Sequence, residues 1–352
     1  MTVQHQGIQS TKGLSRILKT LTISNPRIRA GLLLVVGLLF ASPSFANASD
    51  LNTSSSATDW LNQMRDSLRT LNYRISFVVS QDGAQAEPYL WRHGLVSGIE
   101  MEHLSLLNGP GREAFRVGGK VSYFEPATPP YSIRSHFING PIPSQFFIDP
   151  EQLGHAYDIV LVGKSRVSGL AAQQIRIISK DNSRYSFVAW LDQQTALLLK
   201  LDMLDLEGKL LEQMQVTSLH LSDEADEYFH KIEQDKLPDI TMVGANEIVR
   251  HQWSINWLPA GMRVVKRDVH RLPVTGHAVD YVLLSDGMVD VSVYVHPIQG
   301  AGAEKGWLRH ESTTLLSLNN GNVEVAVVGK IPPETANAIA TSIRPNTRQR
   351  SR

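Results

Sequence analysis

The side chains that could perform catalysis or hold a metal ion are spread thinly along this sequence. The chain has no cysteine, which excludes thiol nucleophiles, thiolate metal sites and disulfide bonds. Gly163-Lys164-Ser165 resembles the end of a phosphate-binding loop, but Asp158 stands where that loop needs its first glycine. The histidines do not cluster at the spacings of metal ligands. We therefore expect no catalytic residue, no metal site and no cofactor, although a hydrolase site built from ordinary polar residues stays open as an alternative.

Large aromatic side chains are instead the prominent feature of the first half of the chain. Residues 126–150 combine six prolines with several aromatics, which predicts a long loop with a short helix. Such a loop covers a curved sheet poorly, and uncovered apolar area costs about 25 cal/mol per Å². We therefore predict an apolar groove that holds an acyl chain. The candidate lining residues are Trp91, Phe115, Tyr123, Phe124, Phe137, Phe146, Phe147, Phe187 and Trp190.

The first residues of the chain have the pattern of a secretory signal. Five basic residues and no acidic one precede the apolar run at 31–40, and small residues follow, with cleavage expected after Ala46 or Ala48. The apolar run is about ten residues long, which is short for a membrane span. Cleavage would leave 29 basic against 34 acidic side chains, a net charge of −5. We expect a periplasmic protein that does not bind nucleic acid.

The 352 residues predict two domains. We assign 1–48 to the signal peptide, 50–221 to a first domain, 222–244 to an acidic helical linker, 245–345 to a second domain and 346–352 to a disordered tail. An amphipathic helix is expected at 59–71, capped by Thr58 or Asp59. Alternating strands with tight turns follow, above all between 157 and 219. Tight turns imply antiparallel neighbours, so the fold class is α+β: a curved antiparallel sheet with covering helices, plus a smaller α+β domain.

Two sequence patterns predict the secondary structure of the second domain. Valines alternate with polar residues at 289–296 and 323–327, which predicts strands, and Pro332-Pro333 predicts the start of a helix. Trp257 is expected in the core of this domain. Trp307 is the candidate for contact with a partner.

Several ordered segments resemble the RseB (MucB) family of periplasmic sigma-factor regulators. They include Val121-Ser122-Tyr123-Phe124-Glu125-Pro126, Arg184-Tyr185-Ser186-Phe187 with Trp190 and Asp192, Trp257-Leu258-Pro259, Ser285-Asp286-Gly287 and Val328-Gly329-Lys330-Ile331-Pro332-Pro333. Ordered matches across two domains are much more specific than a single motif. The resemblance runs from the helix at Trp60 to about Ile343.

The resemblance implies a first domain shaped like the lipoprotein carriers LolA and LolB, a half-open antiparallel β-barrel. It implies that the second domain helps to bind the periplasmic part of the anti-sigma factor RseA and shields RseA from the site-1 protease. Lipopolysaccharide or lipoprotein acyl chains would release the complex. A lipoprotein carrier is the alternative, but a carrier leaves the second domain unexplained. Self-association is left open.

Overall fold

The computed structural model describes residues 55–81, 83–240, 251–271, 278–298 and 306–346. These residues belong to one compact unit, Thr53–Arg352. The predicted signal peptide lies outside the described residues. Within them, no helix has both the length and the apolar character that crossing a membrane requires.

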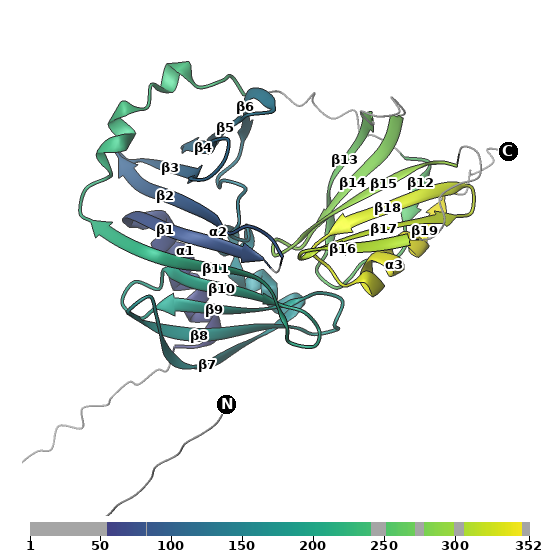
Figure 1. Ribbon diagram of the computed structural model, residues 1–352, viewed down its shortest axis with the longest axis horizontal. Helices are drawn as coiled ribbons and strands as arrows, with labels where there is room; N and C mark the ends of the chain where they lie inside the picture. The colour runs from purple at the N-terminus through teal and green to yellow at the C-terminus, as the bar shows by residue number, and fades with distance from the viewer. Residues whose placement is uncertain (1–54, 82, 241–250, 272–277, 299–305, 347–352) are drawn as a thin grey trace, which may run out of the picture. The chain divides into compact units, whose positions relative to one another are not determined.

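The first part of the chain forms an antiparallel sheet of eleven strands, ordered β6-β5-β4-β3-β2-β1-β11-β10-β9-β8-β7 (Figure 1). The two end strands, β6 and β7, do not pair with each other, so the sheet stays open as expected for a half-barrel. The strands are β1 (Asn72–Gln81), β2 (Glu87–Val96), β3 (Ile99–Leu106), β4 (Arg112–Val117), β5 (Lys120–Glu125), β6 (Thr128–Arg134), β7 (Tyr157–Val167), β8 (Leu170–Ser179), β9 (Ser186–Asp192), β10 (Leu198–Leu204) and β11 (Leu210–Ser222).

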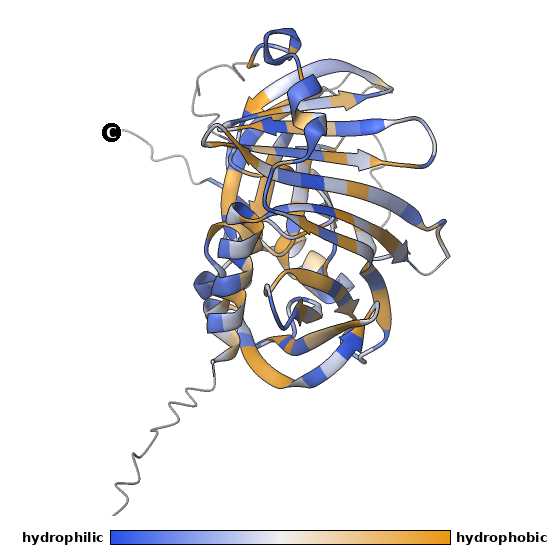
Figure 2. Cartoon of the chain, turned by 90° about the vertical axis from the view of Figure 1, so that its left-hand side faces the viewer, coloured by the Kyte–Doolittle hydropathy of each residue, from blue (hydrophilic) through white to orange (hydrophobic). Residues whose placement is uncertain are grey.

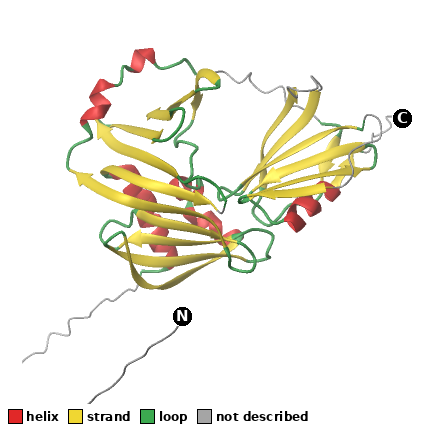
Figure 3. Cartoon of the chain, in the orientation of Figure 1, coloured by secondary structure: helices red, strands yellow, loops and turns green. Residues whose placement is uncertain are grey.

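Helices cover one face of this sheet, which we call the inner face (Figure 3). The longest is α1 (Ala57–Thr70), which buries Leu61, Met64 and Leu68. It begins at Ser56, whose hydroxyl accepts the backbone N–H of Asp59, while the Asp59 carboxylate accepts the N–H of Ser56. The predicted cap at Thr58 or Asp59 was therefore wrong by a few residues, because Asp59 completes a capping box instead of starting the helix.

The proline-rich region contains a strand that the sequence did not predict. Strand β6 includes Pro129 and Pro130, yet it pairs with β5 through Tyr123↔Tyr131 and Val121↔Ile133. An end strand tolerates proline because a missing N–H on its outer side breaks no ladder bond. The rest of the region forms the short helix α2 (Gln145–Ile148) and the 3₁₀ helix η1 (Pro150–His155).

The two ends of the sheet differ. Along β6, Ser132 bridges to Ile240 and donates to the Pro238 carbonyl at 2.6 Å. Among the described residues, β7 has a partner strand on one side only. Its Val160, Leu161 and Val162 are exposed, and the register shifts between Leu161 and Gly163.

The linker is fastened to the outer face of the first sheet. It contains two short 3₁₀ helices, η2 (Glu227–Lys231) and η3 (Gln234–Lys236), in place of a single α-helix. Tyr228 stacks on His103 with ring centroids 4.7 Å apart, and Asp226 lies 3.4 Å from Arg92. Residues 241–244 of the predicted linker lie outside the described residues.

The second part of the chain forms a six-stranded sheet, ordered β13-β14-β15-β18-β17-β16, and a two-stranded sheet, β12-β19. The helix α3 (Pro333–Ser342) starts at the predicted prolines and packs on β17 and β18. The strands are β12 (Trp253–Ile255), β13 (Arg263–Arg271), β14 (Ala278–Ser285), β15 (Asp290–Pro297), β16 (Gly306–His310), β17 (Thr313–Asn320), β18 (Val323–Gly329) and β19 (Ile343–Pro345).

Hydrophobic and hydrophilic residues alternate along many strands of both sheets (Figure 2). The valines at 291, 293 and 295 are buried as their alternation predicts. Trp257 is 40% exposed, so its assignment to the core was wrong. It lies between β12 and β13, outside any strand.

Candidate functional site

Three of the predicted aromatic residues lie on the inner face of the first sheet. Trp91 pairs across the strands with Leu104, which pairs with Ala114 and then Tyr123. Directly paired residues of antiparallel strands point to the same face, so Trp91 and Tyr123 share it. By the same rule Phe187, two residues from Ala189, lies on the inner face with Leu201 and Met214.

Three more of these residues belong to the segment that covers the inner face. Phe146 and Phe147 are in α2, and both are buried. Phe147 contacts Trp91 edge-on, with ring centroids 5.9 Å apart, and stacks on Phe137 at 6.3 Å. The fold thus brings Trp91, Phe137 and Phe147 into one aromatic cluster under the cover.

The remaining three candidates, Phe115, Phe124 and Trp190, lie on the opposite face. Phe115 is paired with His103 and Ser122 and contacts Phe124 edge-on at 5.7 Å. Trp190 is adjacent to the inward Ala189 and packs under the Lys200 ammonium group, 4.4 Å from the ring centroid. Strand alternation separates these residues from the inner face, and local sequence does not reveal which face a strand presents.

The protein's own side chains fill most of the space between the inner face of the sheet and the aromatic residues that cover it. The hollow beside Phe77, Trp91 and Phe147 measures only about 20 Å³. A cleft of about 430 Å³ remains beside it, with a floor of Phe187, Leu201, Met203 and Met214. A second hollow of about 280 Å³ lies above Leu104 and Ala114. The larger cleft falls within the range of about 300–1,000 Å³ that is typical of small-molecule sites.

A buried carboxylate forms part of the wall between the two larger hollows. Glu212 Oε2 accepts hydrogen bonds from Lys330 Nζ and Gln81 Nε2, both at 2.5 Å, and from Ser312 Oγ at 3.1 Å. Glu212 belongs to the first sheet, whereas Lys330 and Ser312 come from the second part of the chain. Glu212 and Lys330 line both hollows.

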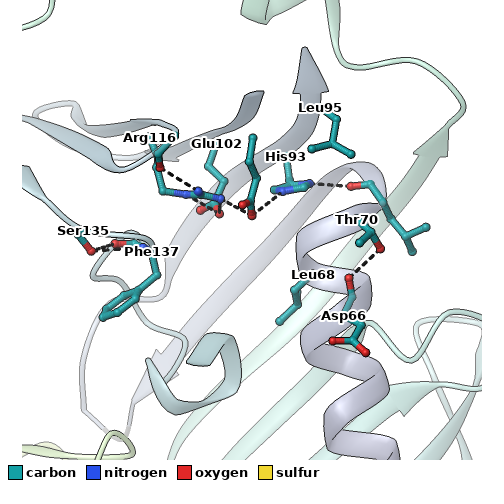
Figure 4. A network of polar contacts seen from close by, with 12 residues as sticks. Asp66, Leu68, Thr70, His93, Leu95, Glu102, Arg116, Ser135 and Phe137 are labelled. Atoms are coloured by element: carbon teal, nitrogen blue, oxygen red, sulfur yellow. Dashed lines mark hydrogen bonds and ion pairs between the residues drawn. The ribbon is translucent and has the colours of Figure 1, made fainter. Parts of the chain in front are cut away.

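A charged network is buried on the inner face near the end of α1. Arg116, only 1% exposed, lies 2.5 Å from the carboxylates of Glu100 and Glu102 (Figure 4). His93 Nε2 is 3.3 Å from Glu100, and His93 Nδ1 is 2.6 Å from the Leu71 carbonyl. The guanidinium group compensates both carboxylates, which offsets the cost of burying them.

The same network determines the protonation of its members. Burial of Glu100 favours the neutral acid, but hydrogen bonds from His93 and Arg116 outweigh it and lower the pKa of Glu100 to about 2. Burial dominates at Glu102 and raises its pKa, even though Arg116 opposes this. His93, Glu100 and Glu102 are the only described group placed to hold a metal, and Arg116 already supplies the positive charge there.

A second buried ion pair joins the loop before β9 to the turn between β14 and β15. Arg184 Nε lies 2.9 Å from Asp286 Oδ2, and Arg184 also donates to the Ala260 carbonyl. The Tyr157 hydroxyl donates to Asp286 at 3.2 Å, and Thr335 donates to the Ser183 carbonyl at 2.8 Å. The first sheet and the second domain therefore meet through charged groups that are excluded from solvent.

Trp307 is on β16, the end strand of the second sheet, and is 59% exposed. Its neighbour Leu308 is opposite Leu315 on β17, and both of these side chains are also exposed. Because neighbours along a strand point to opposite faces, Leu308 and Leu315 share one face of the sheet and Trp307 lies on the other. Exposed apolar side chains on an end strand are typical of an interaction surface.

The sequence reasoning missed the charged residues of the site. Glu102 shares its strand face with Glu100, and Arg116 shares its face with Arg112, so alternation alone did not indicate that these charges are buried. Glu212 carried no signal either, because its partners are far away in the sequence. Arg184 and Asp286 belong to segments that carried the family resemblance, but their pairing was not foreseen.

Comparison with known proteins places these features in a family. The model of the MucB/RseB N-terminal domain matches residues 56–241, and that of the MucB/RseB C-terminal domain matches residues 247–344. The sigma-E factor regulatory protein RseB of Escherichia coli K12 is 30% identical over 313 residues, covering 88% of this chain and 96% of the relative. The Salmonella typhimurium protein of the same name is 32% identical over 286 residues, covering 81% and 89%.

Solved structures agree with this assignment. The chain resembles MucB in the Pseudomonas aeruginosa MucA/MucB complex, with 28% identity and a TM-score of 0.68, over 82% of this chain and 99% of that one. A second structure, of MucB in complex with MucA(peri), gives 29% identity and the same TM-score and coverage. Family models, relatives and structures agree over both domains, and the chain therefore belongs to the MucB/RseB family.

Proposed function

We propose that this chain is a periplasmic, non-enzymatic regulator that binds the periplasmic part of an RseA-like anti-sigma factor and shields it from proteolysis. The observation that carries the proposal is the match over both domains to MucB, which has been solved in complex with MucA(peri). A carrier would need only the first domain. A periplasmic location agrees with the signal-like leader.

The partner docks, in this proposal, on the β16 end of the second sheet. Trp307 on one face of β16, and Leu308 with Leu315 on the other, are exposed apolar side chains there, and such side chains stabilise a complex when a partner buries them. The outer backbone groups of β16 have no strand partner among the described residues, so an extended segment of the partner can pair with them.

The proposed signal for release is an acyl chain that enters the cleft of about 430 Å³. Each methylene buried on its apolar floor contributes about 0.8 kcal/mol. The cleft is lined by Phe187 and Met214 of the first sheet and by Met288 and Val328 of the second domain. An occupant therefore touches both domains and can favour an arrangement that binds the partner less tightly.

The test is a pull-down with the mature full-length chain. It should recover the membrane-anchored anti-sigma factor encoded in the same genome, and lipid A or a lipopeptide should reduce the recovery. Recovery of outer-membrane lipoproteins alone would instead establish a carrier.

A further inference from the structure

The segment Phe137–Ser144, which we call the covering segment, separates the three hollows of the inner face. Gly140 and Pro141 line all three. The largest hollow is bordered by the whole segment, the second by its Asn139–Pro141 part, and the smallest by Ile138 and Gly140–Ile142. Displacing this single segment would join the hollows into one groove.

The covering segment is held by a few contacts. Its backbone N–H at Asn139 donates to the Tyr123 hydroxyl at 3.1 Å. At its start, Ser135 Oγ accepts the N–H of Phe137 at 3.2 Å and donates to the Phe137 carbonyl at 2.7 Å (Figure 4). No described backbone hydrogen bond fixes Gly140, Pro141 or Ile142. Opening the segment thus breaks few hydrogen bonds.

Two isoleucines insert from the covering segment into the core. Ile142 belongs to the main hydrophobic cluster, and Ile138 belongs to a smaller cluster with Ala114, Val121 and Tyr123. Both are almost fully buried. An acyl chain that takes their places exchanges one apolar contact for another, so entry need not leave apolar surface exposed to water.

The far end of the covering segment touches the second domain. Ser144 Oγ and the backbone N–H of Gln145 both donate to the Gly287 carbonyl, at 3.2 and 3.0 Å. Gly287 follows Asp286, the partner of Arg184. A displacement of the segment is therefore transmitted directly to the turn that forms the buried ion pair between the domains.

We propose that Phe137–Ser144 is a lid. It opens to admit one acyl chain along the joined hollows, with Ile138 and Ile142 as the plugs that the chain replaces. The lid rests on the proposed function, because it assigns the step by which an apolar ligand enters the cleft and is sensed at the Gly287 turn.

The test compares variants that loosen the segment with a matched control. Ser135→Ala removes the bonds at its start without altering the cavity lining, and Tyr123→Phe removes the acceptor for Asn139. Tyr131→Phe is the control, because Tyr131 stacks on Tyr123 at 5.2 Å and its hydroxyl has no hydrogen-bond partner among the described residues. The probe is cis-parinaric acid, with association followed by stopped-flow fluorescence and backbone opening by hydrogen–deuterium exchange.

Losing one hydrogen bond corresponds to about a fivefold change in an equilibrium. We expect Tyr123→Phe, which removes one bond, to raise the association rate and the exchange of the non-proline amides of 137–144 by about fivefold, Ser135→Ala, which removes two, to raise both at least as much, and Tyr131→Phe to change neither. Bound probe should further speed exchange in wild-type 137–144.

Three results would overturn the lid. Faster exchange without faster association means that the segment opens but does not gate entry. Equal effects in the Tyr131→Phe control mean that the segment is not specifically responsible. Wild-type protein that binds no cis-parinaric acid removes the lipid part of the proposed function and the lid with it, whereas binding at rates that all variants share removes the lid alone.

Discussion

Arg184 and Asp286 form an ion pair at 2.9 Å in which the two side chains are 0% and 2% exposed. Arg184 precedes β9 of the first sheet, and Asp286 sits in the turn before β15 of the second. Each charge is compensated chiefly by the other, since water is excluded. Together with Glu212 and Lys330, this pair joins the two domains through buried charge.

Replacing Arg184 with methionine should destabilise the protein by about 3 kcal/mol, because Asp286 would remain buried without its cation. Urea unfolding followed by tryptophan fluorescence measures the loss. Arg134→Met, at an exposed position on β6, is the control and should change stability by less than about 0.5 kcal/mol. Equal losses in both variants would contradict a specific role for the pair.

Arg116→Met should lower the free energy of unfolding by about 3–5 kcal/mol at pH 7, since two buried carboxylates lose their cation. Urea unfolding measures this loss. The matched control on the same strand is Arg112→Met, whose ion pair with Glu87 is exposed and should be worth less than about 1 kcal/mol. The loss at Arg116 should shrink as the pH is lowered, because burial raises the pKa of Glu102 and a protonated Glu102 no longer needs a cation. A loss independent of pH would contradict this account.

The stability of the fold should fall on mild acidification because of His103. Burial and the nearby Arg92 lower the pKa of His103 to about 4, against about 6.5 when unfolded. The unfolded chain therefore binds the proton first, and stability falls as the pH drops from about 6.5 to about 4, by on the order of 1.4 kcal/mol per unit. Glu100, with a pKa of about 2, contributes to the pH dependence of stability only below about pH 4.5.

His103→Phe keeps the stacking on Phe115 and Tyr228 but cannot titrate. Its stability should vary less between pH 6.5 and 4.5 than that of the wild type, measured by urea unfolding at each pH. His155→Phe, at an exposed position, should keep the wild-type profile. An unchanged slope in His103→Phe would assign the acid sensitivity elsewhere.

Phe137→Asp should weaken binding of an acyl ligand at least tenfold, because it places a charge at the wall of an apolar cleft. Phe124→Asp is the comparison, since Phe124 lies on the outer face and should leave binding unchanged. Fluorescence titration with cis-parinaric acid measures both. Stronger loss in Phe124→Asp would move the ligand to the outer face.

Trp307→Ala should weaken binding to the anti-sigma partner by at least tenfold, as expected for an exposed aromatic that becomes buried in a complex. Trp257→Ala is the control, because it is also exposed and lies in the same domain. Calorimetric titration with the partner's periplasmic domain gives both affinities. If only Trp257→Ala loses affinity, the partner docks elsewhere.

The sequence revealed the periodic elements and missed what depends on pairing between distant strands. The alternation at 157–219 and at 289–296 predicted strands because one face of each is buried. The face that Phe115, Phe124 and Trp190 occupy depends on register, which local alternation leaves undetermined. Pro129 and Pro130 argued against a strand, yet the position of β6 at the end of the sheet removes the penalty.

The buried charges could not be predicted either, because they depend on contacts between residues that are distant in the sequence. His93, Glu102 and Arg116 come together only because β2, β3 and β4 are adjacent, and Glu212 meets Lys330 only across the two domains. The helix α1 and the helix start at the Pro332-Pro333 pair were readable, since hydrophobic periodicity and proline placement act within a few residues.

The unequal ends of the first sheet bear on how this protein behaves at high concentration. The chain shields β6 with its own residues 237–240, whereas β7 presents Val160, Leu161 and Val162 to solvent. An exposed end strand of this kind can pair with the same strand of a second molecule, which leads to aggregation at high protein concentration. The register shift between Leu161 and Gly163 makes this edge irregular, and an irregular edge is a poor template for the strand of a second molecule.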